Sequence, residues 1–227
     1  MKFTVEPIAH IKSDFSSKFG IPRQSGLVDE LEAKIIFEPQ YRIPEAFRGL
    51  EGYSHVWILW QFSECAGKEW SPTVRPPRLG GNKRMGVFAS RSPFRPNSIG
   101  LSCVKLISVD ETEENGTVLT VSGADLLDGT PIIDIKPYLP YVDAHPEASG
   151  GFALQDKEGS LEIDFPNELL AAIPEDKQEA LTAVLRQDPR PQYHNDPERI
   201  YGLEFAGFDL RFKIRDNLLT VVEIKKI

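Results

Sequence analysis

One segment of the chain, residues 75–100, concentrates residue types that hold phosphate groups. It reads RPPRLGGNKRMGVFASRSPFRPNSIG, with arginines interspersed among prolines and glycines. Arginine binds phosphate through two parallel donors, proline stiffens the backbone, and glycine permits close backbone approach. Phe94 stands among the arginines, where its ring could stack on a base. The segment predicts either a nucleic-acid contact or a basic loop that only faces solvent.

Two further segments carry candidate proton-transfer groups. Asp128-Gly129 is expected to form a tight turn ahead of a strand, which puts a carboxylate at the start of that strand. Residues 187–193, QDPRPQY, offer an acid, a cation and a phenol at one corner. Asp128 and Tyr193 are therefore candidate general bases, in that order. Each also has a simpler interpretation, because turn aspartates often only cap their turn and tyrosines often only pack.

The distribution of charge supports a local basic surface. The net charge of −8 argues by itself against nucleic acid, because phosphate contacts need cations. Glu69 is nevertheless the only acid between Lys68 and Lys105, while acidic residues collect at 110–114 and 158–164. The cations between those two lysines are Arg75, Arg78, Lys83, Arg84, Arg91 and Arg95. A basic patch on an acidic body can still bind RNA.

Several familiar kinds of site are not indicated by the sequence. Neither G-x-G-x-x-G nor G-x-x-x-x-G-K-[ST] occurs, so a Rossmann or P-loop nucleotide site is not supported. Cys65 and Cys103 are expected to be small buried hydrophobes, and no metal site is expected from the scattered histidines. No secretory signal is visible, and the longest apolar run, 56–60, is too short to cross a bilayer. We expect a cytoplasmic protein.

The elements that must position these residues are mostly strands. Apolar runs separated by Gly, Pro and Asn predict strands at residues 3–11, 33–37, 55–62, 84–90, 100–110, 117–125 and 130–135. Many short strands with regular turns favour a closed or nearly closed barrel. Residues 56–60 lack a polar member and are expected to be buried on both faces.

A different pattern begins after a glycine-rich stretch at 149–151. Two helices are expected at 166–172 and 174–187, followed by a hairpin that turns at Asp216-Asn217. We expect a mainly β chain with a β-barrel domain at 1–154, a smaller α+β domain at 155–227, and no Rossmann fold.

At these segments the sequence closely resembles the TrmO family, also called YaeB- or TsaA-like. The resemblance runs through most of the chain and is carried by PRQSGL at 22–27, RGLEGYSHVWIL at 48–59, the Arg/Pro/Gly segment, DGTP and IKPY between 128 and 138, and DPRP at 188–191. It implies a homodimeric β-barrel methyltransferase that uses S-adenosylmethionine. The family substrate it implies is threonylcarbamoyl-adenosine at tRNA position 37, methylated on N6.

The resemblance also implies site residues. The cofactor contacts carried across are Gln24, Ser25, Gly26, Ser63, Glu64, Arg91, Leu101, Asp128, Gly129 and Thr130. The residues expected to hold the anticodon stem-loop through phosphate contacts are Arg78, Lys83, Arg84, Arg95 and Arg190. The sequence departs from the family at Ser25 and Ser98, where prolines are usual, and Ser63-Glu64 is a variable position.

Two other functions fit the same residues. A barrel with basic, aromatic-bearing loops could bind RNA or a nucleotide without performing chemistry. Asp128, His145 and Tyr193 could instead serve a small-molecule hydrolase, because resemblance in fold does not by itself determine function.

Overall fold

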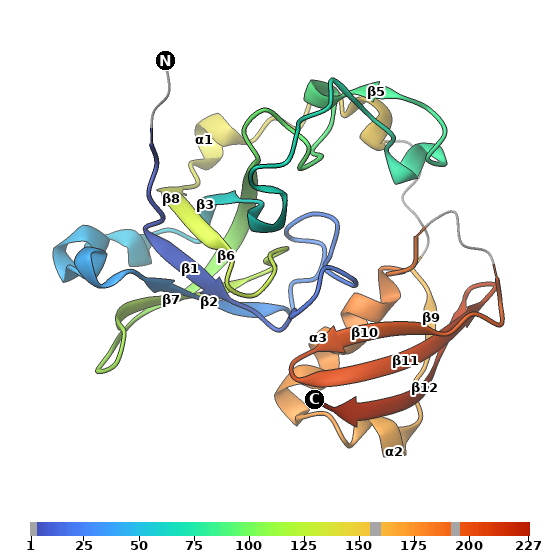
Figure 1. Cartoon of the computed structure of the whole chain (residues 1–227). Helices are drawn as coiled ribbons and strands as arrows, with labels where there is room; N and C mark the ends of the chain where they lie inside the picture. The colour runs from blue at the N-terminus through green and yellow to red at the C-terminus, as the bar shows by residue number, and fades with distance from the viewer. Residues whose placement is uncertain (1–3, 155–159, 192–195) are drawn as a thin grey trace. The chain divides into compact units, whose positions relative to one another are not determined.

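The computed structural model describes residues 4–154, 160–191 and 196–227, which form two compact units (Figure 1). Unit 1 comprises the chain up to Ser13 together with Arg23–Tyr138. Unit 2 comprises Asp14–Pro22 and Leu139–Ile227. This division differs from the expected boundary at residue 154, because it joins a short N-terminal segment to the C-terminal part of the chain.

Unit 1 is built around a closed barrel with the strand order β1-β2-β7-β6-β3-β8, all neighbours antiparallel. The strands are β1 (Ala9–Lys12), β2 (Glu32–Phe37), β3 (His55–Gln61), β6 (Ile99–Thr112), β7 (Gly116–Ser122) and β8 (Pro131–Pro137). Closure pairs every strand of this sheet on both sides, so the barrel leaves no free edge. The expected mainly β, non-Rossmann fold is confirmed.

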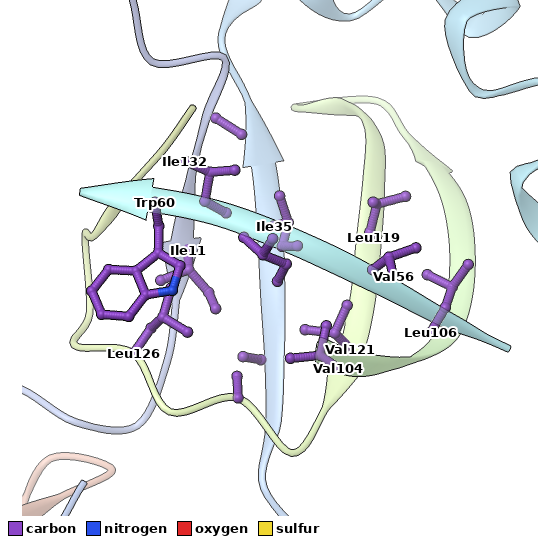
Figure 2. Packing of buried hydrophobic residues seen from close by; sticks show 14 of the residues in the cluster. Ile11, Ile35, Val56, Trp60, Val104, Leu106, Leu119, Val121, Leu126 and Ile132 are labelled. Carbon is purple, nitrogen blue, oxygen red and sulfur yellow. The ribbon is translucent and has the colours of Figure 1, made fainter. Parts of the chain in front are cut away.

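The interior of the barrel is filled by alternate side chains of its strands. In β3, Val56, Ile58 and Trp60 are buried, while the residues between them are half-buried. Figure 2 shows inward-facing apolar residues from several strands packing together, among them Ile35, Leu119 and Ile132. The expectation that β3 is buried on both faces is therefore wrong. Its outward residues Trp57 and Leu59 are apolar but only partly covered.

The pairing register gives the barrel two distinct ends. At one end, β1, β3 and β7 finish while β2, β6 and β8 begin, as the pairs His10 with Pro131, Gln61 with Ile99 and Glu32 with Ser122 show. We call this the site end. The opposite end we call the pocket end. Long strand β6 pairs first with β3 and then with β7, and a register shift between Leu106 and Ser108 helps it bend between the two partners.

Between β3 and β6 the chain makes a long excursion from the site end, which we call the basic excursion (residues 63–98). It contains β4 (Thr73–Val74), β5 (Met85–Gly86) and the 3₁₀ helices η4 (Ser63–Cys65), η5 (Pro77–Leu79) and η6 (Val87–Ala89). The strand expected at 84–90 is wrong beyond β5. Beyond β5 the residues Val87–Ala89 form η6, and the partner strand β4 is followed by Arg75 and then Pro76, which has no amide proton to extend the ladder.

The pocket end is covered by three further 3₁₀ helices: η1 (Pro39–Tyr41), η2 (Pro44–Phe47) and η3 (Leu50–Gly52). An apolar hollow of about 370 Å³ lies there. Its lining includes Phe37, Tyr41, Phe47, Leu119 and Pro137. With no charged side chain in its lining, this hollow does not suit a strongly charged ligand.

Unit 2 is an α+β assembly. Its sheet has the order β10-β11-β12-β9, with β9 (Glu162–Asp164) parallel to β12 and the other pairs antiparallel. The remaining elements are α1 (Pro140–Asp143), η7 (Gly151–Leu154), α2 (Asn167–Leu170), α3 (Glu175–Arg186), β10 (Tyr201–Phe205), β11 (Phe208–Arg215) and β12 (Leu218–Lys226). The two expected helices and the final hairpin are confirmed, whereas β9 and β10 were not predicted.

The segment Asp14–Pro22 is built into unit 2. Phe15 is 1% exposed and meets Phe205 edge-on, with ring centroids 5.5 Å apart. Lys177 Nζ lies 2.7 Å from Asp14 Oδ2. A Cβ at Gly20, whose φ is +91°, would lie 2.2 Å from Leu203 Cδ1. These contacts join residues more than 160 positions apart in the sequence.

Among the helices of the described residues, none combines the length and apolarity needed to cross a bilayer.

Candidate functional site

A tight backbone contact brings the Gln24–Gly26 loop to the end of β7. The Gly26 amide donates to the carbonyl of Gly123 at 2.9 Å. Both glycines have positive φ, and a Cβ at Gly123 would lie 3.2 Å from the Gly26 backbone. The missing side chain of Gly123 lets the two backbones approach so closely, whereas at Gly26 glycine suits the positive φ. The loop expected to contact the cofactor is thereby held at the site end.

A hydrogen-bonded chain runs from inside the barrel to the same place. Trp60 Nε1 donates to Ser102 Oγ at 3.0 Å, and Ser102 Oγ donates to Asp125 Oδ1 at 2.6 Å. Trp60 and Ser102 are 7% and 1% exposed. The indole fits because Gly100 has no side chain, since a Cβ there would lie 2.3 Å from Trp60 Cε2. The core of the barrel thus orients the carboxylate of Asp125.

Asp125 is electrostatically the most distinctive group of the site. Burial raises the pKa of Asp125 above its ordinary value, and the Ser102 hydrogen bond, the positive charge of Arg91 and a backbone hydrogen bond from Ser25 oppose that rise. Arg91 also donates through Nη1 to the side-chain oxygen of Gln24. A partly desolvated carboxylate therefore lies near a guanidinium and an amide, an arrangement suited to a ligand that carries charges of both signs.

The Asp128 corner is also at the site end, but its carboxylate already has a structural task. Asp128 Oδ1 accepts the backbone amide of Ser13 at 2.9 Å. The Gly129 amide donates to Ile11 at 2.9 Å, and Thr130 Oγ1 donates to the Leu127 carbonyl at 2.7 Å. These bonds hold the turn between β7 and β8 against the end of β1. The Asp128 carboxylate thus ties the turn to the end of β1 rather than capping the turn itself, and its side chain is exposed.

The remaining residues expected to contact the cofactor lie at or next to strand ends of the barrel. Ser63 and Glu64 lie in η4, directly after β3, and both are exposed. Leu101 lies on β6 opposite Leu59, between the buried Gly100 and Ser102, and is 52% exposed. Since inward and outward positions alternate along a strand, Leu101 faces out of the barrel. All of the residues proposed for the cofactor therefore belong to unit 1 and cluster near its site end.

The expected phosphate-binding residues are divided between the units. Lys83 and Arg84 are exposed on the basic excursion, where Arg84 Nη1 also donates to Thr73 Oγ1 at 3.1 Å. Arg78 belongs to η5. Arg95 is half-buried and directs Nη1 at the carbonyls of Val87 and Ser90, at 3.1 and 2.6 Å. An arginine expected to meet phosphate thus supports its own loop.

Arg190 belongs to unit 2. Its Nε lies 2.9 Å from Asp188 Oδ2, and both side chains are 19% exposed. Tyr193 lies outside the described residues. His145, one member of the alternative hydrolase set, is exposed in unit 2 with Nδ1 3.5 Å from Glu147 Oε1. Within the described parts of the chain, no three His, Cys, Asp or Glu side chains gather as a metal site requires.

Sequence reasoning missed the Trp60–Ser102–Asp125 chain. A signal was available at Asp125, because this acid interrupts the otherwise apolar and small residues of 121–127. An ionisable residue in such a run is either paired or functional. Trp60 and Ser102 carried no comparable signal, because their meeting depends on the pairing of β3 with β6.

The fold and site define a class: a closed antiparallel β-barrel, not a Rossmann domain, with a mixed-charge site at one end and an accessory α+β unit. Residues 10–144 match the tRNA-methyltransferase O N-terminal domain, and residues 158–227 match the TrmO C-terminal domain. The chain belongs to the TrmO family.

Similar proteins agree with this membership. The chain is 41% identical over 222 residues to the tRNA (adenine(37)-N6)-methyltransferase of Escherichia coli, covering 94% of each chain. The crystal structure of TrmO from Pseudomonas aeruginosa superposes with a TM-score of 0.78 at 34% identity, over 99% of this chain and all of that one. A probable S-adenosyl-L-methionine-binding protein of Methanothermobacter thermautotrophicus is 37% identical over 144 residues, which are 63% of this chain and 96% of that protein.

Proposed function

We infer that this protein is an S-adenosylmethionine-dependent tRNA methyltransferase that modifies N6 of the adenine at position 37. Family membership across both parts of the chain supports this activity, as does similarity to relatives named for it. The structural observation that carries the proposal is the gathering of Gln24, Arg91, Ser102 and Asp125 at one end of the barrel. A binding protein without chemistry is the less favoured alternative, since these relatives are named as methyltransferases.

The polar groups at the site end fit S-adenosylmethionine. The cofactor carries a sulfonium and an ammonium, which a desolvated carboxylate attracts, and a carboxylate, which matches a guanidinium. We therefore propose that Asp125 attracts the cationic part and that Arg91 pairs with the carboxylate. The other proposed contacts are Gln24, Ser25, Gly26, Ser63, Glu64, Leu101, Asp128, Gly129 and Thr130. When bound, the cofactor supplies an electrophilic methyl group.

The chain's own contribution to the reaction is mainly positioning. Aligning a nitrogen with a methyl group converts an encounter into an intramolecular step. The acceptor we propose is the N6 of threonylcarbamoyl-adenosine, whose proton must leave during transfer. Asp128 is the first candidate base and Tyr193 the second. Because Asp128 already accepts the Ser13 amide, its carboxylate is held in a defined orientation.

We propose that the anticodon stem-loop is the part of tRNA that is held, because it carries position 37, and the exposed cations suit its phosphates. Lys83 and Arg84 are exposed on an excursion whose residues 70–98 contain no acid. We propose that these two, with Arg78, make direct phosphate contacts. Arg95 and Arg190 are engaged within the protein, so we propose a smaller, indirect effect for them. A homodimer in the cytoplasm completes the proposal, and light scattering of the purified protein tests the dimer.

The decisive experiment combines calorimetry with a methylation assay. Titration of S-adenosylmethionine should give saturable heat with the wild type, and nucleoside mass spectrometry should detect one added methyl on N6 of threonylcarbamoyl-adenosine. Arg91→Ala should weaken cofactor binding roughly ten-fold or more, because a hydrogen bond to a charged group is lost. Lys225→Ala is a matched control, since its cation pairs with Glu223 on the exposed surface of unit 2. Tight RNA binding without cofactor heat would favour the non-catalytic alternative.

A further inference from the structure

Phe88 is unusually exposed for a phenylalanine. It lies in the middle of η6, and 73% of its surface is accessible. Its neighbour Val87 is 1% exposed and donates its amide to the Pro72 carbonyl at 3.0 Å. The loop is therefore anchored by Val87 while the ring of Phe88 is presented to solvent. Large exposed apolar groups on a well-anchored loop commonly mark a contact surface.

Arg95 fixes the loop that presents this ring. Its guanidinium carbon lies 5.7 Å from the centre of the Phe88 ring. The same guanidinium donates to the carbonyls of Val87 and Ser90, which flank Phe88 in the sequence. The Ser90 amide also donates to the Val87 carbonyl, at 3.1 Å. The Arg95 guanidinium beside the ring and its hydrogen bonds to residues on either side of Phe88 restrict the motion of the loop. A ligand that binds the ring therefore loses less affinity to ordering the loop.

The surroundings of Phe88 suit a polyanion with flat, apolar bases. Trp70 and Phe94 are 49% and 45% exposed on the same basic excursion, and the Ser71 amide donates to the Phe94 carbonyl at 3.3 Å. No Asp or Glu occurs from residue 70 to residue 104, whereas lysines and arginines recur. Aromatic rings among arginines and lysines are the arrangement by which proteins hold single-stranded nucleic acid.

We propose that Phe88 is a stacking platform for an unpaired base of the RNA substrate and that Arg95 is its positioning residue. This inference rests on the proposed function, because it takes tRNA as the partner. The stacked base is one beside the target adenosine in the loop, since unpaired bases expose the faces that aromatic rings need. The cations and aromatic rings together match the phosphates and base faces of RNA, whereas two copies of a chain of net charge −8 repel each other overall, so RNA is the occupant.

The test compares three variants of Phe88 with the wild type in tRNA binding and methylation. Phe88→Ala should raise the Kd and the KM for tRNA roughly ten-fold, as expected for loss of one stacked base, and leave the heat of S-adenosylmethionine binding unchanged. Phe88→Trp should restore binding, and its added emission should change when tRNA is bound. Phe88→Leu should not restore binding, because it keeps apolar area without a π face. Ile43→Ala, exposed at the pocket end, is the matched control and should behave as wild type.

Three results for the Phe88 variants would overturn the stacking role. Unchanged tRNA affinity in Phe88→Ala would show that no base stacks there, and full rescue by Phe88→Leu would indicate simple apolar packing. A change of oligomeric state in Phe88→Ala, seen by sedimentation, would assign the ring to an interface between copies. Arg95→Lys should lower affinity less than Phe88→Ala, and equal tRNA affinity for Arg95→Lys and wild type would remove its positioning role. If the wild type itself neither binds the cofactor nor methylates tRNA, the proposed function fails instead.

Discussion

Removing the hydroxyl of Ser102 tests whether the barrel core controls the charge of Asp125. In Ser102→Ala, the Trp60 Nε1–H loses its acceptor in a position that is 7% exposed. An unmet buried donor costs about 1–3 kcal/mol. Asp125 also loses the hydrogen bond that most opposes the rise of its pKa, so the ionised carboxylate is destabilised further. The free energy of unfolding should therefore fall by about 1–3 kcal/mol, and by more above the pKa of Asp125 than below it.

Urea unfolding at several pH values, followed by tryptophan fluorescence, measures this loss. The matched control is Ser108→Ala, because Ser108 lies on the same strand and donates to a carboxylate, Asp110, at an exposed position. Its change should stay within about 0.5 kcal/mol. A double-mutant cycle with Asp125→Asn should show coupling between Ser102 and Asp125. The reasoning is refuted if the Ser102→Ala loss does not depend on pH and adds fully to that of Asp125→Asn.

Three further perturbations test other parts of the structure. Asp125→Asn should remove a pH dependence of stability. Because the pKa of Asp125 is raised in the folded state, the folded wild type binds more protons than the unfolded wild type above the ordinary pKa of 3.8. The stability of the wild type relative to the variant should therefore fall as pH rises through the raised pKa. Urea midpoints from acid to neutral pH measure this, and parallel curves would contradict it. Gly100→Ala should lower the free energy of unfolding by about 1–3 kcal/mol and weaken cofactor binding, because the new Cβ clashes with the Trp60 indole. An unchanged heat of cofactor binding would contradict a role for the Trp60–Ser102–Asp125 chain. Phe15→Ala should destabilise unit 2 by about 3–5 kcal/mol, which is measured as a loss of amide-exchange protection in β10 and β11. Protection lost only in the barrel strands would instead show that the segment 14–22 belongs to unit 1.

Much of the barrel could be predicted because its signals are local. Alternating apolar residues and turn residues are read within a few positions, so β2, β3, β6, β7 and β8 were expected close to where they occur. The strand expected at 84–90 failed because the local pattern does not show that its partner β4 is soon followed by Pro76. Strand β9 has three residues and its pairing depends on β12, so no local pattern marked it. In β10, apolar Tyr201, Leu203 and Phe205 alternate with Gly202 and Glu204, so a local signal was present there and was missed.

The candidate site divides in the same way. Resemblance to the TrmO family indicated the Gln24–Gly26 loop and Arg91, and the residue types at Asp128-Gly129 indicated a turn. Asp125 gained its importance only from burial and from Ser102 and Arg91, which lie 23 and 34 positions away in the sequence. Arg95 shows the opposite case. Its residue type suggested phosphate binding, whereas the folded loop uses its donors on two carbonyls.

The sequence by itself determined the class of fold, because short-range periodicity persists whatever the chain does at long range, and its resemblance to the TrmO family indicated the chemistry to expect. The tertiary structure alone decided which groups meet. Strand register placed Trp60 against Ser102, the missing side chain of Gly123 allowed one loop to reach the end of β7, and residues 14–22 pack within unit 2. Each of these contacts joins distant parts of the chain, where stability comes from packing and pairing that no local pattern encodes.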